Sequence, residues 1–67
     1  MKTYTANIAA IYSRMGQYEN AITNYKKWTE LEPSNSEAWY GLGSSYMSYG
    51  QVYDAIKALN TALKLNP

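Results

Sequence analysis

The sequence predicts an all-α protein of four antiparallel helices, and three observations support that prediction. The chain matches itself when it is shifted by 34 positions. Its apolar residues recur in steps of three and four, the helix spacing, without the sustained alternation that indicates a strand. Gly and Pro fall between the periodic segments, where helices are expected to end. We therefore expect two helix–turn–helix hairpins within the 67 residues.

The internal match divides the chain into two copies of one unit. Identical residues occupy equivalent positions in a single register: Tyr12 and Tyr46, Gly16 and Gly50, Gln17 and Gln51, Ala21 and Ala55, Ile22 and Ile56, Leu31 and Leu65, Pro33 and Pro67. A self-match at a fixed period is the signature of a repeat architecture. We expect one domain over residues 1–67, with a first repeat at about 2–34 and a second at about 35–67.

The first hairpin is expected to contain two helices that meet at Gly16. One apolar helical face consists of Tyr4, Ile8, Ile11, Tyr12 and Met15. The next consists of Tyr18, Ala21, Ile22, Tyr25 and Trp28. Glycine readily adopts the left-handed conformation that ends a helix, and Pro33 is expected to stop the second helix.

The second hairpin repeats this plan, with Gly50 at its turn. Either Ser34 or Asn35 can cap its first helix, and Glu37 stands three residues after Ser34 as in a capping box. The two expected core faces are Trp39, Leu42, Tyr46 and Tyr49, and then Val52, Ala55, Ile56, Leu59, Ala62 and Leu63. The chain has eight Tyr, two Trp and no Phe, so we expect half-buried rings whose hydroxyl groups reach water.

The composition excludes several kinds of function. Cys and His are absent, which removes disulfides and the common zinc sites, and we expect neither a metal nor a cofactor. The formal net charge is +1 and Lys26-Lys27 is the only adjacent basic pair, so nucleic acid is not an expected partner. No apolar run approaches the length of a membrane span, and the first residues lack the apolar core of a signal peptide. A cytoplasmic location is the default expectation.

The second copy resembles a tetratricopeptide repeat (TPR), whose pattern is W-x2-L-G-x2-Y, then A-x3-F, then P, over 34 residues. The matching residues are Trp39, Leu42, Gly43, Tyr46, Ala55 and Pro67, with Leu59 at the Phe position. The first copy is looser and has Thr5 at the Trp position. The resemblance covers nearly the whole chain and implies a short right-handed α-solenoid.

Most residues of the pattern are expected to be structural. Gly43 is expected to let crossing helices approach, and the periodic apolar stripes are expected to form the core. Trp28 is bulky where the family is usually small, and we expect it to fit against a helix rich in small residues. The alternative is that Trp28 is a platform for a ligand. No arrangement of catalytic residues is present, so an enzyme is not expected.

The resemblance implies a non-enzymatic scaffold that binds a peptide or protein on the concave face formed by the first helix of each repeat. The concave positions carried over are Thr3, Ala6, Asn7, Ala10, Ser13 and Arg14, then Glu37, Tyr40, Gly41, Ser44, Met47 and Ser48. The peptide-binding candidates are Asn7, Arg14, Tyr40, Ser44 and Met47. Alternatively, these positions are solvated surface. Ala6 and Ala10 replace the Lys and Asn of the family's carboxylate clamp, so that specificity is not expected.

The two ends of the chain suggest a second function. The last helix keeps an apolar face that a following repeat would cover, and the first helix is bulky where the family prefers small residues. The self-association candidates are Tyr4, Ile11, Leu59, Ala62 and Leu63. We expect a homo-oligomer, joined head to tail or by exchange of helices. In this alternative the chain is an excised or engineered repeat unit without a specific ligand.

Overall fold

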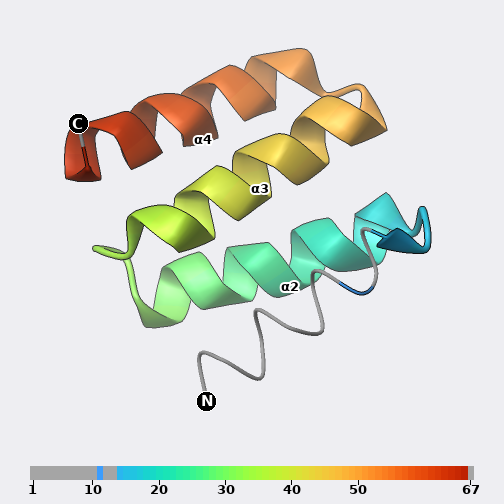
Figure 1. Cartoon of the computed structure of the whole chain (residues 1–67), viewed down its shortest axis with the longest axis horizontal. Helices are drawn as coiled ribbons and strands as arrows, with labels where there is room; N and C mark the ends of the chain where they lie inside the picture. Colours follow the sequence, from blue (N-terminus) through green and yellow to red (C-terminus); the bar gives the residue numbers. More distant parts are fainter. Residues whose placement is uncertain (1–10, 12–13, 67) are drawn as a thin grey trace.

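The fold is an array of antiparallel α-helices, seen in a computed structural model that describes residue 11 and residues 14–66 (Figure 1). These residues contain α2 (Tyr18–Leu31), α3 (Ser36–Tyr49) and α4 (Val52–Leu65), and no strand. The helices run in alternating directions, and α3 lies between α2 and α4. The prediction of an all-helical chain is confirmed for this part.

Only the end of the expected first helix falls within the described residues. Ile11 and Arg14 have helical backbone. The backbone amide of Met15 donates to the carbonyl oxygen of Ile11 at 3.0 Å, as in a helical turn. The rest of that helix lies outside the described residues, so the prediction of four helices is confirmed for three of them.

Both expected glycine turns are present. Gly50 has φ of 97° and Gly16 has φ of 79°, in the region that favours glycine. Beyond α3, the amide of Gly50 donates to the carbonyl oxygen of Met47 at 3.2 Å. The amide of Gln51 donates to the carbonyl oxygen of Tyr46 at 2.9 Å. These bonds satisfy carbonyl groups that the end of a helix leaves without partners.

Asn35, rather than Ser34, caps α3. Its Oδ1 accepts a hydrogen bond from the backbone amide of Glu37 at 2.9 Å. Because α3 begins at Ser36, Glu37 is too near the cap to complete a box with Ser34. The expected stop before Pro33 is confirmed, since α2 ends at Leu31.

The core cluster is small and is centred on one buried apolar residue from each of these helices. Ile22, Leu42 and Ala58 form its centre, surrounded by the partly buried rings of Tyr25, Trp39 and Tyr46. The expectation of half-buried tyrosines is thus met at two of these positions. Packing of an apolar stripe from each helix provides most of the helical stability in so short a chain.

Two glycines within α3 allow its neighbours to pack closely. A Cβ on Gly41 would overlap the ring of Tyr25, and a Cβ on Gly43 would lie 2.6 Å from Cγ of Leu59. The role predicted for Gly43 is confirmed. The large ring facing the small-residue side of α3 at Gly41 is that of Tyr25, which stacks on Trp28 with ring centroids 6.2 Å apart.

Trp28 is not a ligand platform, because its side chain is only 5% exposed. Its ring is buried and is not accessible from solvent. Its Nε1 has no hydrogen-bond partner among the described residues. The burial of Trp28 agrees with a role in packing, while the ring beside Gly41 of the small-residue helix is that of Tyr25.

Some residues expected on the core faces are exposed instead. Met15, Val52 and Ile56 are each about half exposed or more. The buried residues of α4 are the small Ala55, Ala58 and Ala62, and Leu59 beside them packs against Gly43 of α3. The apolar residues of α4 therefore form two adjoining sides of the helix, one buried at Ala55, Ala58 and Ala62 and one exposed at Val52, Ile56 and Leu63.

Candidate interaction surface

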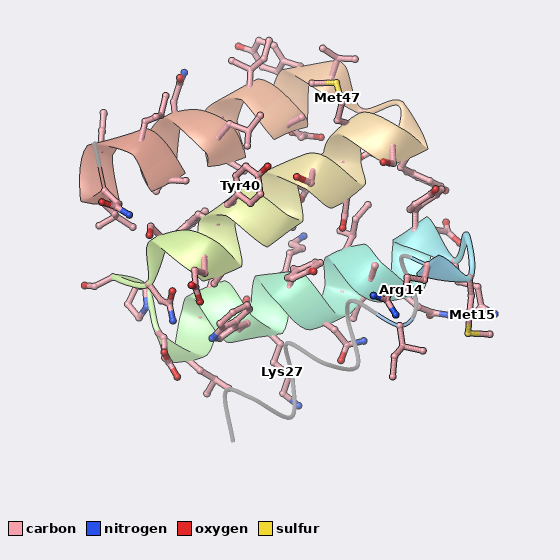
Figure 2. All side chains as sticks on the ribbon, viewed as in Figure 1. Arg14, Met15, Lys27, Tyr40 and Met47 are labelled. Atoms are coloured by element: carbon pink, nitrogen blue, oxygen red, sulfur yellow. The ribbon has the colours of Figure 1, made fainter. Side chains whose placement is uncertain are left out.

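Three of the peptide-binding candidates form one exposed stripe along α3. Tyr40 is 63% exposed, Met47 is 46% exposed, and Ser44 is an exposed residue between them. Their spacing of four and then three residues places them on the same side of a helix. Figure 2 shows Tyr40 near the start of α3 and Met47 near its end. The structure therefore brings together the candidates that come from the second repeat.

The candidates from the first repeat are only partly described. Arg14 is exposed just before the Gly16 turn (Figure 2), and Asn7 lies outside the described residues. Gly41, another concave position from the family pattern, is partly covered by the ring of Tyr25. The described peptide-binding candidates are thus one cation, Arg14, and the exposed stripe on α3.

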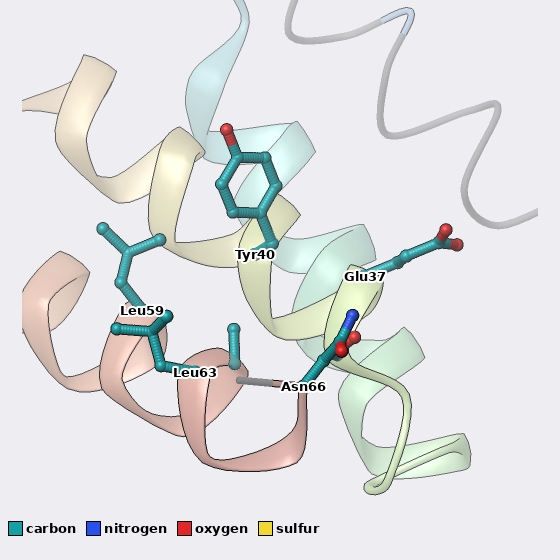
Figure 3. A pocket seen from close by; sticks show the side chains of 7 residues that line it. Glu37, Tyr40, Leu59, Leu63 and Asn66 are labelled. Carbon is teal, nitrogen blue, oxygen red and sulfur yellow. The ribbon is translucent and has the colours of Figure 1, made fainter.

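An apolar groove of about 470 Å³ lies between the start of α3 and the end of α4. Its lining consists of Ser36, Glu37, Tyr40, Leu59, Ala62, Leu63 and Asn66. Figure 3 shows Tyr40 on one side, with Leu59 and Leu63 on the other. The groove therefore joins a peptide-binding candidate to three of the self-association candidates. A concave, mainly apolar site with a few polar groups at its edge is the usual form of a binding pocket.

The self-association candidates on α4 occupy different depths in this groove. Leu63 is 61% exposed, Leu59 is partly exposed, and Ala62 is buried at 8% exposure. Ile11 is 54% exposed on the other side of the chain, and Tyr4 lies outside the described residues. Sequence reasoning missed the exposure of Ile56, although it lies four residues after Val52 and seven before Leu63, which places the three residues on one side of the helix.

A second groove, of about 480 Å³, lies on the opposite side of α3 and was not predicted. Trp39, Leu42 and Tyr46 of α3 form part of its lining, and the other residues come from α2 and α4. The indole Nε1 of Trp39 donates to the carbonyl oxygen of Pro33 at 2.9 Å. That bond fixes the ring beside the loop before α3. The groove borders the core, because Leu42 and Ala58 belong to both.

One polar contact joins the beginning of α2 to the end of α3. The hydroxyl of Tyr49 donates to Oε2 of Glu19 at 2.7 Å. This hydrogen bond, with smaller contributions from desolvation and from the charge of Glu19, raises the pKa of Tyr49. Burial raises the pKa of Tyr25 as well. Both phenols therefore stay neutral to higher pH than a free tyrosine.

Neither a membrane span nor a metal site is found in the part of the chain that the structure describes. None of its helices is both long enough and apolar enough to cross a bilayer. No cluster of three or more acidic side chains there could hold a metal ion.

Known proteins match this chain over nearly its whole length. A family model described as "TPR repeat" matches residues 9–50, and one described as "Tetratricopeptide repeat" matches residues 36–67. The chain is 30% identical over 64 residues to "Small glutamine-rich tetratricopeptide repeat-containing protein 2" of Mycosarcoma maydis, covering 96% of this chain and 18% of the relative. It is 35% identical over 60 residues to "Anaphase-promoting complex subunit 3" of Dictyostelium discoideum, covering 90% and 6%.

A human protein also matches most of this chain. "Superkiller complex protein 3" of Homo sapiens is 30% identical over 56 residues, covering 84% of this chain and 4% of that protein. The chain thus spans between 4% and 18% of the length of these three curated relatives.

Proposed function

This chain belongs to the tetratricopeptide repeat family, and we propose that its concave surface binds a peptide segment of a partner protein. Membership supports a role in protein interaction in general. The proposed binding surface consists of the stripe of Tyr40, Ser44 and Met47 together with the groove beside Tyr40. Arg14, and Asn7 outside the described residues, complete the proposed site.

The observation that carries this proposal is the exposure of Tyr40 next to an apolar groove. Tyr40 is 63% exposed, and Leu59 and Leu63 form the facing wall of the groove. An exposed tyrosine beside a pocket is a favourable anchor, because its ring adds contact area and its hydroxyl keeps a polar partner. We therefore propose that an apolar side chain of the peptide enters the groove while the peptide backbone runs along α3.

Peptides selected from a displayed library provide the probe for this proposal. The affinity of a selected peptide is measured by calorimetry for the unmodified chain and for Tyr40→Ala and Arg14→Ala. Removing an anchor side chain is expected to weaken binding by about tenfold or more. Tyr53→Ala is the matched control, since Tyr53 is an exposed tyrosine of α4 outside both grooves. Unchanged affinity in Tyr40→Ala and Arg14→Ala would remove the site assignment.

A second candidate function is self-association through the open side of α4. The observation that favours it is the exposure of Leu63 at the end of the chain's apolar stripe, with Ile11 exposed at the other end of the array. Burial of such surfaces drives most protein association. Sedimentation equilibrium is expected to give a mass that rises with protein concentration. A folded monomer at every concentration would contradict this candidate.

A further inference from the structure

We propose that the groove beside Tyr40 selects peptides in which a lysine or arginine lies within two residues of the apolar anchor, and that Glu37 makes this selection. The inference rests on the proposed function, because it names the chemistry of the peptide that the groove binds. The groove is the one of about 470 Å³ between the start of α3 and the end of α4. Glu37 lies three residues before Tyr40 and therefore on the same side of α3.

Glu37 carries the only charge among the described residues that line this groove. The walls are formed by Tyr40, Leu59 and Leu63, and the remaining lining residues are small or neutral. Figure 3 shows Glu37 and Asn66 together, across the groove from Leu59. A peptide whose apolar side chain enters the groove therefore has a carboxylate beside it.

The carboxylate of Glu37 is available to a cation from another molecule. Glu37 is exposed, and its side chain makes no hydrogen bond or ion pair with the other residues that the structure describes. The bond to Asn35 involves the backbone amide of Glu37 only. Lys64 is a cation in the last turn of α4, but it is not among the described residues that line the groove.

The end of α4 adds negative character to the same edge of the groove. α4 ends at Leu65, and Asn66, the residue that follows, lines the groove. The last carbonyl groups of a helix lack partners within the helix and carry a partial negative charge, which favours a nearby cation. The start of α3, where the partial charge is positive, lies at this edge as well, and the full charge of Glu37 outweighs it. The edge therefore favours a cation over an anion.

Lysine and arginine match this edge in shape as well as in charge. Glu37 and Tyr40 are separated by a helical rise of about 4.5 Å, and successive residues of an extended peptide are about 3.5 Å apart. A residue close to the anchor is therefore level with Glu37. The long aliphatic part of a lysine or arginine side chain can pack on the ring of Tyr40 while its charged end reaches the carboxylate.

Peptide selection followed by a double-mutant cycle tests this inference. A random displayed-peptide library is selected on the unmodified chain and on Glu37→Gln, which removes the charge and nearly keeps the shape. One peptide enriched on the unmodified chain is then compared by calorimetry with a version in which glutamine replaces its basic residue. Glu30→Gln is the matched control, since Glu30 is an exposed carboxylate of α2 outside this groove. Tyr40→Ala is measured alongside, and circular dichroism checks that each variant is folded.

The expected result is a coupling between Glu37 and the basic residue of the peptide. Lysine or arginine is enriched near an apolar residue on the unmodified chain and on Glu30→Gln, and this enrichment is lost on Glu37→Gln. Glu37→Gln weakens binding of the basic peptide by about two- to fivefold, the effect of an exposed ion pair, and leaves the glutamine version unchanged. The difference shrinks at high salt, because salt screens exposed charges.

The other outcomes separate this inference from the proposed function. If no basic residue is enriched, or if Glu37→Gln changes the affinity of both peptides alike or of neither, the inference is wrong. A like change in both peptides would assign Glu37 to the stability of the first turn of α3 alone. The proposed function stands in those cases as long as Tyr40→Ala weakens binding. If Tyr40→Ala has no effect either, or if no peptide is enriched on the unmodified chain, both are wrong.

Discussion

Replacing Gly43 by alanine tests the close approach of α3 and α4. The added Cβ would lie 2.6 Å from Cγ and 2.7 Å from Cδ2 of Leu59, and 3.3 Å from the carbonyl oxygen of Ala55. Carbon atoms in contact normally lie about 3.5–4.0 Å apart. Leu59 must therefore move, and the backbone oxygen of Ala55 restricts the sideways shift of α3 that would relieve the overlap. The substitution is expected to separate the two helices.

Two opposing effects determine the size of the change in stability. Alanine is favoured over glycine in a helix interior by about 1 kcal/mol. Forcing an extra methyl group into a packed contact costs about 1–3 kcal/mol. We therefore expect Gly43→Ala to lower the free energy of unfolding by about 1 kcal/mol, because the larger effect opposes folding. In a domain of this size, that loss lowers Tm by about 4–8 °C.

Urea unfolding followed by circular dichroism measures this change, and Leu59→Ala provides the partner for a double-mutant cycle. Removing the Leu59 side chain should relieve the overlap, so the two substitutions together are expected to be less destabilising than the sum of each alone, by about 1 kcal/mol. Ser48→Ala is the control, an exposed position of the same helix where alanine should not destabilise. A gain in stability for Gly43→Ala, or additive effects in the cycle, would refute the reasoning.

Three further substitutions examine the turn, the cap and the inter-helix hydrogen bond. Gly50→Ala is expected to lower the free energy of unfolding by about 1–2 kcal/mol, because a Cβ is crowded in the left-handed backbone conformation of residue 50. Thermal unfolding measures this loss. Asn35→Ala removes the acceptor of the Glu37 amide and should cost about 0.5–2 kcal/mol, whereas Asn35→Ser should recover most of it in the same assay. The pKa of Tyr49 is raised in the folded state by its hydrogen bond to Glu19. Below the ordinary tyrosine pKa of 10.0 the hydrogen bond stabilises the folded state fully. Its contribution is lost as the pH rises through the higher pKa of the folded state. The stability difference between the unmodified chain and Tyr49→Phe should therefore shrink in alkaline solution, and a difference that grows there would contradict the assignment.

The turns and helix limits could be predicted because they depend on local chemistry. Gly50 adopts a backbone conformation that crowds other residues, and Pro33 cannot continue α2. The choice between Ser34 and Asn35 as the cap could not be made from sequence, because both can accept the same kind of hydrogen bond. It depends on whether α3 begins at residue 35 or at Ser36, which the packing of the whole helix decides.

The candidate site was predictable in part. The stripe of Tyr40, Ser44 and Met47 follows from the helix period together with the family pattern, and the structure places these three residues on exposed surface. Whether they bind a peptide stays a prediction. The groove between α3 and α4 could not be read from sequence, because it depends on how far apart two helices lie. Its walls come from Tyr40 and Leu63, which are far apart in the chain.

The sequence by itself determined the repeat, the helical class and the family, because period, glycine position and a short residue pattern are properties of the chain alone. Only the tertiary structure decided which apolar residues are covered. Ile22 and Ile56 are the same residue at the same repeat position, yet the first is buried and the second is half exposed. The physical reason is that burial depends on a neighbour: Leu42 of α3 packs with Ile22 in the core, whereas the described part of the chain contains no helix after α4.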